Sequence, residues 1–459
     1  MKKVAIIGAG PAGLSAAYRL ATSYSASSKD LEITIFEKGK EIQNRKCAKI
    51  EERKDCAKCS PCNIVSGVGG AGLFSDGKLI YSNRTGNNLP GLIGDEKSQY
   101  YLDEVEKIFS SYGVDTEKRD FEAEAEIERK AFEYGIEFIP SKQTHIGSDK
   151  LPSLMDKIIS DLKANGVKIN SGERLEDILD KKIVTSNGSY DFDSMIIATG
   201  RDEKENFENI CKKININYEY NPVDIGVRVE VPYQIMEKAC KVNWDFKARI
   251  RLENDDEVRT FCVCPRGFVA KEDHGDYTLV NGYSSKDKQS ENTNFAFLVK
   301  WKPKNPDISG DEFGRNIACT ITKNSGGMPT LQKFGDFKKR RRSTWERISR
   351  GYVKPTLKDV NPGRIGSSLP EDFAQDIKEG LIILDKLVPG IASDSTLLYS
   401  PEIKMHGIKV LTNEYLESNK QGIYFAGDCS GYSRGIVGAA ASGLLAADGI
   451  LLKQIFGEK

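Results

Sequence analysis

The chain has 459 residues, enough for about three domains or for one large domain with insertions. Hydrophobic residues make up 39% and charged residues 29%, which excludes a disordered tail and a bundle of membrane helices. Lysine plus arginine and aspartate plus glutamate each number 67, so binding to nucleic acid through bulk charge is not expected. We find no apolar run of about 18 residues, and the apolar stretch after Lys3 is too short for a signal peptide. The composition predicts a soluble, cytoplasmic enzyme that does not enter a membrane.

The first residues predict a βαβ unit with a glycine-rich turn. Apolar runs at 3–7 and 31–36 have the length of short buried strands, and residues 14–20 between them have helical spacing. The turn between the first strand and the helix reads Gly8-Ala9-Gly10-Pro11-Ala12-Gly13, a Gly-x-Gly-x-x-Gly pattern in the context that binds dinucleotides. Its three glycines would permit a tight turn, the approach of a pyrophosphate, and close packing of helix on sheet. The carboxylate of Glu37 at the end of the second strand would bind a ribose, which favours FAD or NAD over NADP. The alternative is a glycine turn that binds nothing.

Further along the chain, the pattern changes from helical spacing to apolar–polar alternation. The alternation is clearest at 224–231 and predicts a mostly antiparallel sheet within residues 215–305. A strand at 423–426, a turn at Gly427-Asp428 and an alanine-rich helix from about Gly435 close the chain. The other expected elements are helices within 97–135 and at 151–165 and 371–387, and strands at 167–169, 183–184, 193–197, 247–252, 259–263, 277–281 and 294–300.

Several segments resemble those of known flavoproteins. They are Gly67 to Leu79, Met195 to Arg201, Asp224 to Glu230, Cys264 to Gly267, Gly335 to Phe337 with Arg341 to Thr344, Tyr399 to Glu402, and Gly427 to Gly435. On these residues nearly the whole chain is similar to the FAD-dependent dehydrogenases of the glutathione-reductase-like two-domain flavoprotein superfamily, a family whose substrate is largely unassigned. This chain has Asp-Cys-Ser-Gly at 428–431 where the family has an acid followed by Gly and Ala, which would place Cys429 near the flavin.

The resemblance implies an α/β fold, in which a Rossmann-type FAD-binding domain carries an inserted mixed or antiparallel-sheet substrate domain. We expect the FAD-binding domain at 1–85, 150–205 and 395–459, a helical insertion at 86–149 that contacts it, and the substrate or cap domain at 206–394. By the same resemblance, Asp428 would bind the ribityl chain. The residues expected to bind FAD are Gly8, Gly10, Pro11, Ala12, Gly13, Glu37, Lys38, Gly69, Gly70, Ser75, Asp76, Ala198, Thr199, Gly200, Gly427, Asp428, Gly435, Ile436, Val437 and Gly438.

The segment from Gly67 to Leu79 contains five glycines. A loop of this composition allows its backbone to approach a ligand closely and to bind an anion. Ser75 and Asp76 would donate to or accept from the polar edge of a flavin. The alternative is an ordinary surface turn.

Four cysteines, Cys47, Cys56, Cys59 and Cys62, lie within 16 residues. The spacing suits a [4Fe–4S] cluster, which would pass electrons to FAD, and it equally suits a structural zinc ion. A redox-active thiol pair is a third alternative, and unliganded thiols are a fourth. The spacing does not separate them.

The predicted function is that of an FAD-dependent oxidoreductase, a dehydrogenase or reductase, which transfers hydride or electrons between the flavin and a small-molecule substrate. No second Gly-x-Gly-x-x-Gly unit occurs within 150–330, so we expect electrons from transiently bound NAD(P)H, from an electron-donor protein, or from the substrate itself. One alternative is a flavoprotein that acts on RNA or another anionic macromolecule through the basic run 338–342, although such a run is more typical of a solvated helix face. Another is a non-catalytic flavin- or zinc-binding protein. The sequence predicts neither a catalytic acid or base nor an oligomeric state.

Overall fold

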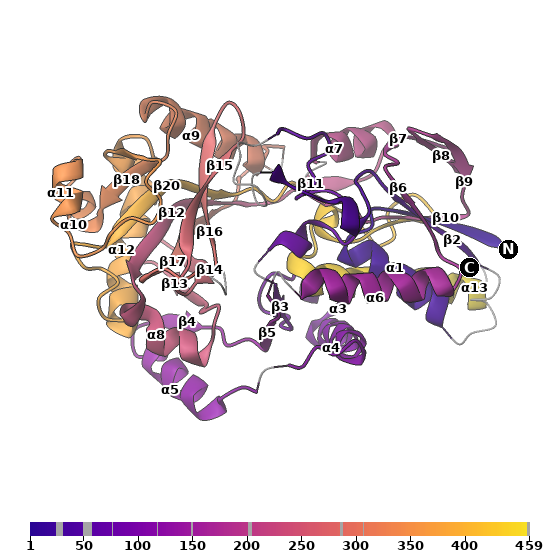
Figure 1. Cartoon of the computed structure of the whole chain (residues 1–459), viewed down its shortest axis with the longest axis horizontal. Helices are drawn as coiled ribbons and strands as arrows, with labels where there is room; N and C mark the ends of the chain where they lie inside the picture. Colours follow the sequence, from indigo (N-terminus) through magenta and orange to yellow (C-terminus); the bar gives the residue numbers. More distant parts are fainter. Residues whose placement is uncertain are drawn as a thin grey trace. The chain divides into compact units, whose positions relative to one another are not determined.

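The computed structural model describes residues 1–23, 31–48, 57–75, 77–116, 118–147, 150–200, 204–284, 288–305 and 307–456. The chain divides into two compact units, whose elements are labelled in Figure 1. The first unit comprises Met1–Glu117, Ser141–Glu219 and Gly407–Lys459. The second comprises Lys118–Pro140 and Tyr220–His406.

The first unit is built on a five-stranded parallel sheet in the order β22-β10-β1-β2-β6. The central strand β1 pairs with β2 and β10 over most of its length, with Ile6 opposite both Ile35 and Ile196. Its residues from Val4 onward are all buried, as expected of a parallel strand covered on both faces. The strands of this sheet are β1 (Lys2–Ile7), β2 (Leu31–Glu37), β6 (Lys168–Ser171), β10 (Ser194–Ile197) and β22 (Ile423–Phe425).

Two helices of the first unit, α1 (Pro11–Thr22) and α13 (Gly435–Phe456), pack against each other in its core. The stretch Gly435–Ile455 is long and apolar enough to span a membrane, a feature that our search of the sequence for apolar runs missed, but 83% of it is buried within the unit. Its alanines and glycines explain this role, because small side chains let neighbouring backbones approach. Among the described residues of this unit, the structure also has helices α3 (Pro90–Ile93), α4 (Asp95–Ser111), α6 (Leu151–Ala164) and α7 (Lys204–Lys213), with 3₁₀ turns η2 (Ile42–Asn44), η3 (Ala71–Phe74) and η6 (Asp428–Ser430).

Short strands complete the first unit. Three of them form a meander, β7-β8-β9, and the others form the pairs β3-β5 and β11-β21. Their bounds are β3 (Lys78–Ile80), β5 (Gln143–His145), β7 (Leu175–Leu179), β8 (Lys182–Thr185), β9 (Gly188–Asp191), β11 (Tyr218–Tyr220) and β21 (Ile408–Val410).

The second unit is built on an eight-stranded sheet in the order β19-β18-β20-β12-β17-β14-β13-β4. All neighbours are antiparallel except β18 and β19, which confirms the predicted mostly antiparallel sheet. The alternating apolar residues of β12, such as Val227 and Val229, belong to the core, and the residues between them include Arg228 and Glu230. The strands are β4 (Ile136–Phe138), β12 (Val223–Pro232), β13 (Ala248–Arg251), β14 (Glu257–Cys264), β17 (Asn292–Trp301), β18 (Thr330–Lys333), β19 (Asn361–Pro362) and β20 (Leu397–Lys404).

A hairpin of β15 (Phe268–Asp273) and β16 (Thr278–Tyr283) lies against β20 and β12 of this sheet (Figure 1). The apolar core is closed by helices, of which α12 (Glu371–Leu387) contacts β12 and β17. The other helices are α5 (Phe121–Phe132), α8 (Tyr233–Val242), α9 (Gly310–Asn324), α10 (Phe334–Lys338) and α11 (Trp345–Ser349), with the 3₁₀ turn η5 (Ile365–Ser367).

The structure confirms the predicted fold class, a Rossmann-type α/β domain with an inserted, mostly antiparallel sheet. The division of the chain differs from the predicted one in three places. β20 was expected in the FAD-binding domain, but it pairs with β12 and β18 of the second unit. The expected helical insertion at 86–149 is divided, because β4 adds to the sheet of the second unit through β13. Residues 206–219, expected in the substrate domain, belong to the first unit. Each difference follows from long-range strand pairing, which residue patterns do not reveal.

Candidate functional site

The glycine turn predicted to bind a dinucleotide joins β1 to α1. Gly8 has a φ of 106°, and its N–H donates to Phe36 O at 2.8 Å. A Cβ atom at Gly13 would lie 2.0 Å from Gly8 O, so only glycine permits this approach. α1 starts at Pro11 after Gly10, and no side chain caps its first turn. Uncapped backbone N–H groups at such a turn are the groups that bind phosphate in dinucleotide folds.

The predicted glycine loop lies directly against this turn. The N–H of Gly69 donates to Ala9 O at 2.8 Å. A Cβ atom at Gly70 would lie 3.0 Å from Gly10 Cα, so the two backbones face each other without side chains between them. Gly67, Gly69 and Gly70 have φ values of 129°, 89° and 76°, a region that favours glycine. The glycine turn at 8–13 and the glycine loop at 67–79, which the sequence analysis singled out separately, therefore form one backbone cradle.

The Glu37 carboxylate, at the end of β2, binds the backbone of the glycine turn. It is 6% exposed and accepts hydrogen bonds from Ala9 N at 2.9 Å and from Gly39 N at 2.8 Å. A carboxylate has about four lone-pair sites, so both oxygens keep capacity to accept from ribose hydroxyls. The neighbouring Lys38 is half-buried.

The carboxyl-terminal segment completes the same edge of the sheet. The N–H of Gly427 donates to Ser442 Oγ of α13 at 2.8 Å, and a Cβ atom at Gly427 would lie 3.0 Å from Ala12 Cβ. A Cβ atom at Gly72 would lie 2.8 Å from Ile436 Cγ1, which places the glycine loop against the start of α13. The contacts of Gly427 with Ala12 and of Gly72 with Ile436 join segments more than 350 residues apart in sequence.

The predicted Ala-Thr-Gly segment at the end of β10 joins this edge as well. A Cβ atom at Gly8 would lie 2.7 Å from Ala198 O, and Cys429 N donates to Thr199 O at 3.3 Å. The carboxyl ends of β1, β2, β10 and β22 thus converge, and this is the edge at which parallel α/β sheets bind their ligands.

Other predicted residues take different positions. Ser75 is exposed and engaged in its own turn, donating to Gly72 O at 2.6 Å and accepting from Gly77 N at 3.3 Å. Gly200 is exposed. Along the first turn of α13, a Cβ atom at Gly438 would lie 3.3 Å from Gly86 O. Asp76 lies outside the described residues.

Cys429, which the resemblance places near the flavin, is a buried thiol. Its Sγ donates to Ala426 O at 3.3 Å. Burial raises the pKa of Cys429 to about 12, so the thiol is neutral at pH 7. It is therefore unsuited to act as a nucleophile without further activation.

The four-cysteine segment is described only in part, because Cys56 lies outside the described residues. Cys47 and Cys62 are half-buried and Cys59 is exposed. Within the described ranges, no three or more His, Cys, Asp or Glu side chains are grouped to hold a metal ion. These three thiols alone do not form a metal site, so we derive no step through a metal.

Sequence reasoning missed Arg45, which is 3% exposed and lies beneath the glycine loop. Its Nη1 donates to Val68 O and to Gly70 O, both at 2.8 Å. The segment around it is polar and charged and shows no periodicity, so no pattern distinguishes this arginine from its exposed neighbours.

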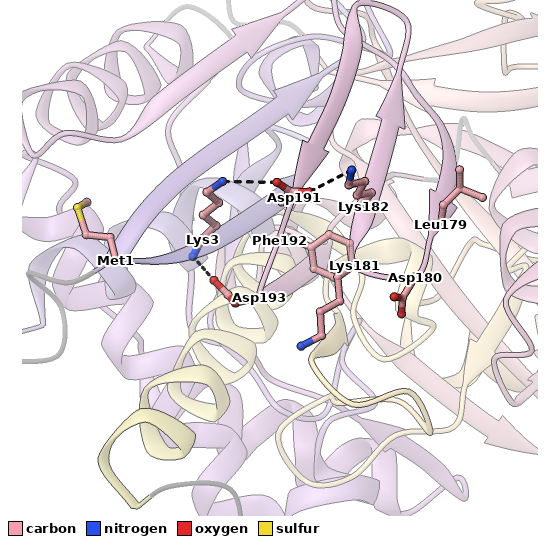
Figure 2. Close-up of a pocket in the computed structure, with 9 residues that line it drawn as sticks. All are labelled: Met1, Lys3, Leu179, Asp180, Lys181, Lys182, Asp191, Phe192 and Asp193. Atoms are coloured by element: carbon pink, nitrogen blue, oxygen red, sulfur yellow. Dashed lines mark hydrogen bonds and ion pairs between the residues drawn. The ribbon is translucent and has the colours of Figure 1, made fainter.

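A surface pocket of about 370 Å³ lies near the opposite edge of the parallel sheet, where β1 and β10 begin (Figure 2). Lys3 Nζ is 3.8 Å from Asp191 Oδ2, and Lys182 Nζ is 3.7 Å from Asp191 Oδ1. The ionisable side chains that line it are three lysines and three aspartates, so it carries no net charge. Neither its place nor its charge suits a dinucleotide.

The polar face of β12 and β20 buries charged side chains in the second unit. Arg228 and Glu402 are both 0% exposed, with Arg228 Nη1 3.7 Å from Glu402 Oε1. Arg228 Nε donates to Asn294 Oδ1 at 2.7 Å, and Lys404 Nζ is 2.7 Å from Glu402 Oε1. Burying an ion costs several kcal/mol, and pairing with an opposite charge offsets that cost. The sheet therefore tolerates these buried charges because they are paired.

The basic run that suggested nucleic-acid binding is largely neutralised by its own unit. Lys338 Nζ is 2.8 Å from Asp394 Oδ1. Arg340 pairs with Glu371, and Arg341 pairs with Asp336. Three of the five cations therefore already face a carboxylate. The prediction of a helix face was wrong, because α10 ends at Lys338 and the other four cations follow it.

Two family models match parts of the chain. Residues 2–204 match the family model described as pyridine nucleotide-disulphide oxidoreductase, and residues 222–405 match the one described as FAD-dependent protein, C-terminal domain-like. These two matches support an FAD-dependent oxidoreductase. The narrower resemblance to the glutathione-reductase-like superfamily stays a prediction.

An uncharacterized protein of Clostridium beijerinckii is 28% identical over 473 residues, which cover 98% of this chain and 80% of that protein. Among solved structures, an L-proline dehydrogenase from P. horikoshii is 11% identical with a TM-score of 0.41, over 98% of this chain and 93% of that chain. A glycine oxidase from Geobacillus kaustophilus is 13% identical with a TM-score of 0.38, over 98% and 94%.

Proposed function

We propose that the first unit binds FAD along the edge where β1, β2, β10 and β22 end, and that the chain exchanges an electron pair with a small-molecule substrate recognised by the second unit. The observation that carries this proposal is the contact between the backbones of Gly10 and Gly70, where no side chain intervenes. Such a cradle fits a pyrophosphate, which needs close approach of backbone N–H groups.

Each part of the edge has an assigned role. The uncapped first turn of α1 binds the pyrophosphate, and Glu37 accepts from the ribose hydroxyls. Asp428 and the first turn of α13 are assigned to the ribityl chain and the flavin ring. When bound, the flavin supplies two-electron oxidation or reduction, while the chain's own residues bind and orient.

The electron source is proposed to be NADH or NADPH, bound transiently. This proposal is open to direct test, because a nicotinamide donor bleaches the flavin absorption of the reconstituted protein under anaerobic conditions. If neither nucleotide does so while dithionite does, the donor is a protein or the substrate.

Binding of iron–sulfur or zinc by the four-cysteine segment also remains a proposal, supported by the spacing of its thiols. Iron and acid-labile sulfide in the purified protein would establish a cluster. One equivalent of zinc would establish a structural zinc site. If the protein contains neither an iron–sulfur cluster nor zinc, the cysteines are thiols that bind no metal.

The deciding experiment for the main proposal is an anaerobic absorption spectrum of the protein reconstituted with FAD and freed of unbound cofactor. We expect flavin bands that dithionite bleaches and air restores. Protein that retains no FAD after reconstitution would contradict the proposal. Flavin that is retained but cannot be reduced would favour a non-catalytic flavin-binding protein.

A further inference from the structure

Arg45 organises the glycine loop through its backbone carbonyl groups. The guanidinium donates to three of them, in Gly67 (3.3 Å), Val68 (2.8 Å) and Gly70 (2.8 Å), and to those of Asn63 (2.9 Å) and Ile64 (2.8 Å) just before the loop. An arginine has five N–H groups, so nearly its whole donor capacity is spent on these five carbonyl groups. The ring of Phe74 covers the guanidinium at 4.8 Å.

These hydrogen bonds decide which side of the loop an anion would meet. Carbonyl oxygens carry partial negative charge and would repel a pyrophosphate. Because Arg45 draws the oxygens of Gly67, Val68 and Gly70 toward itself, they are engaged by a cation and do not oppose an anion. Burial lowers the pKa of Arg45 to about 10, while Glu37 and Cys62 act in the opposite direction, so the side chain stays charged at neutral pH.

Arg45 also binds the two residues that directly follow the cysteine segment 47–62. Asn63 and Ile64, two of its acceptors, directly follow Cys62, and Ser66 N donates to Cys62 O at 2.9 Å. Asn63 Nδ2 donates in turn to Lys46 O at 2.7 Å, next to the first cysteine of the segment. Both ends of the segment are thereby tied to the loop that faces Gly10.

We propose that Arg45 is a positioning residue for FAD, and that it links the glycine loop to Cys62, so that FAD binding and the chemical state of Cys62 influence each other. This rests on the proposed function, since it requires FAD at the Gly10–Gly70 cradle. Coupling between two sites is reciprocal: if modification of Cys62 weakens FAD binding, bound FAD protects Cys62 by the same factor at equilibrium.

The first test measures the FAD dissociation constant by quenching of flavin fluorescence in wild type, Arg45→Met and Arg45→Lys. Arg45→Met should raise the constant by about thirtyfold or more and Arg45→Lys by about tenfold, because lysine cannot reach five acceptors. Arg19→Met is the matched control, since Arg19 of α1 pairs with Glu104 of α4 and with Asp448 of α13. It should leave the constant within about threefold of wild type.

Chemical rescue separates positioning from general loss of structure. Ethylguanidinium added to Arg45→Ala should restore at least part of the lost FAD affinity, whereas ethylammonium should not. If Arg45→Met binds FAD as wild type does, or if both variants lose affinity and no guanidinium restores it, the proposal is overturned. Wild type that fails to bind FAD would instead remove the proposed function.

The coupling is tested by the rate at which iodoacetamide labels individual cysteines, followed by peptide mass spectrometry. Saturating FAD should slow labelling of the half-buried Cys62 by about fivefold or more, and should leave the exposed Cys59 within about twofold. In Arg45→Lys saturated with FAD, the protection of Cys62 should shrink. Equal protection in both proteins would indicate simple shielding by the cofactor and would overturn the coupling, as would no protection in wild type.

Discussion

Gly443 of α13 packs directly on Ala12 of α1, because a Cβ atom at position 443 would lie 2.0 Å from Ala12 O. The two helices begin on either side of the candidate cofactor edge, one after Gly10 and the other at Gly435. Their backbone contact therefore sets the separation of the two helix starts that are assigned to the pyrophosphate and the flavin ring.

Gly443→Ala should therefore destabilise the first unit. Overpacking costs about 1–3 kcal/mol and the helical preference of alanine returns about 1 kcal/mol, so we expect a net loss of up to about 2 kcal/mol. FAD affinity should fall as well, because the helix starts are displaced. Urea unfolding followed by circular dichroism measures the change. Gly91→Ala is the control, because a Cβ atom there would meet nothing within 4 Å, and equal stability of the two variants would contradict the packing argument.

Gly10→Ala should separate cofactor binding from folding. A Cβ atom at Gly10 would have only Gly70 Cα near it, at 3.8 Å, and the backbone φ of −79° suits any residue, so the fold should be retained. The added methyl group would stand where the pyrophosphate must approach, and we expect FAD affinity to fall by about tenfold or more. The measurement is a flavin fluorescence titration beside a thermal melt. Unchanged affinity would place the cofactor elsewhere.

Asp376 of α12 should make the second unit less stable as the pH rises. The side chain is 2% exposed, and burial raises its pKa to about 6, aided by the nearby Asp256. A carboxyl group whose pKa is higher in the folded state binds its proton more tightly there, so stability falls as the pH rises from about 4 through 6. Asp376→Asn should keep the hydrogen bond that Asn254 Nδ2 donates at 3.0 Å.

That substitution should therefore stabilise the unit by about 1 kcal/mol at pH 8, after allowance for solvent screening, and have little effect at pH 4. All three tryptophans, Trp244, Trp301 and Trp345, belong to the second unit, so tryptophan fluorescence reports its unfolding. A benefit of the substitution that is the same at both pH values would show that Asp376 titrates normally.

Cys429 and Cys211 should resist alkylation in the folded protein. Burial raises the pKa of each thiol to about 12, so the thiolate that reacts is scarce at pH 8. Iodoacetamide should label the exposed Cys59 at least about tenfold faster than either. Cys429→Ala should keep FAD affinity within about threefold, since the thiol donates to the backbone carbonyls of Ile197 and Ala426. Rapid labelling of Cys429 would contradict this expectation and would indicate that its thiol is activated.

Much of the site could be predicted because its signals are local. Gly8, Gly10 and Gly13 follow a strand and open a helix, so their positions in the turn are decided by residues within one βαβ unit. The strand and helix around Gly427 and Gly435 are likewise short-range patterns, and α12 was predicted at its observed bounds, 371–387. In each case the backbone conformation depends mainly on neighbours a few residues away.

The rest depended on contacts between distant segments. Arg45 differs in no visible way from other basic residues of its segment, and only the fold brings five carbonyl groups to its guanidinium. From the sequence, β20 was expected in the FAD-binding domain. Its pairing with β12 assigns it to the sheet of the second unit.

The sequence by itself thus determined the class of fold and the cofactor turn, because glycine spacing and apolar periodicity act through short-range sterics and burial. Only the tertiary structure decided how the chain is divided, which glycine segments meet, and which buried cation holds them, because those outcomes depend on hydrogen bonds between residues far apart along the chain.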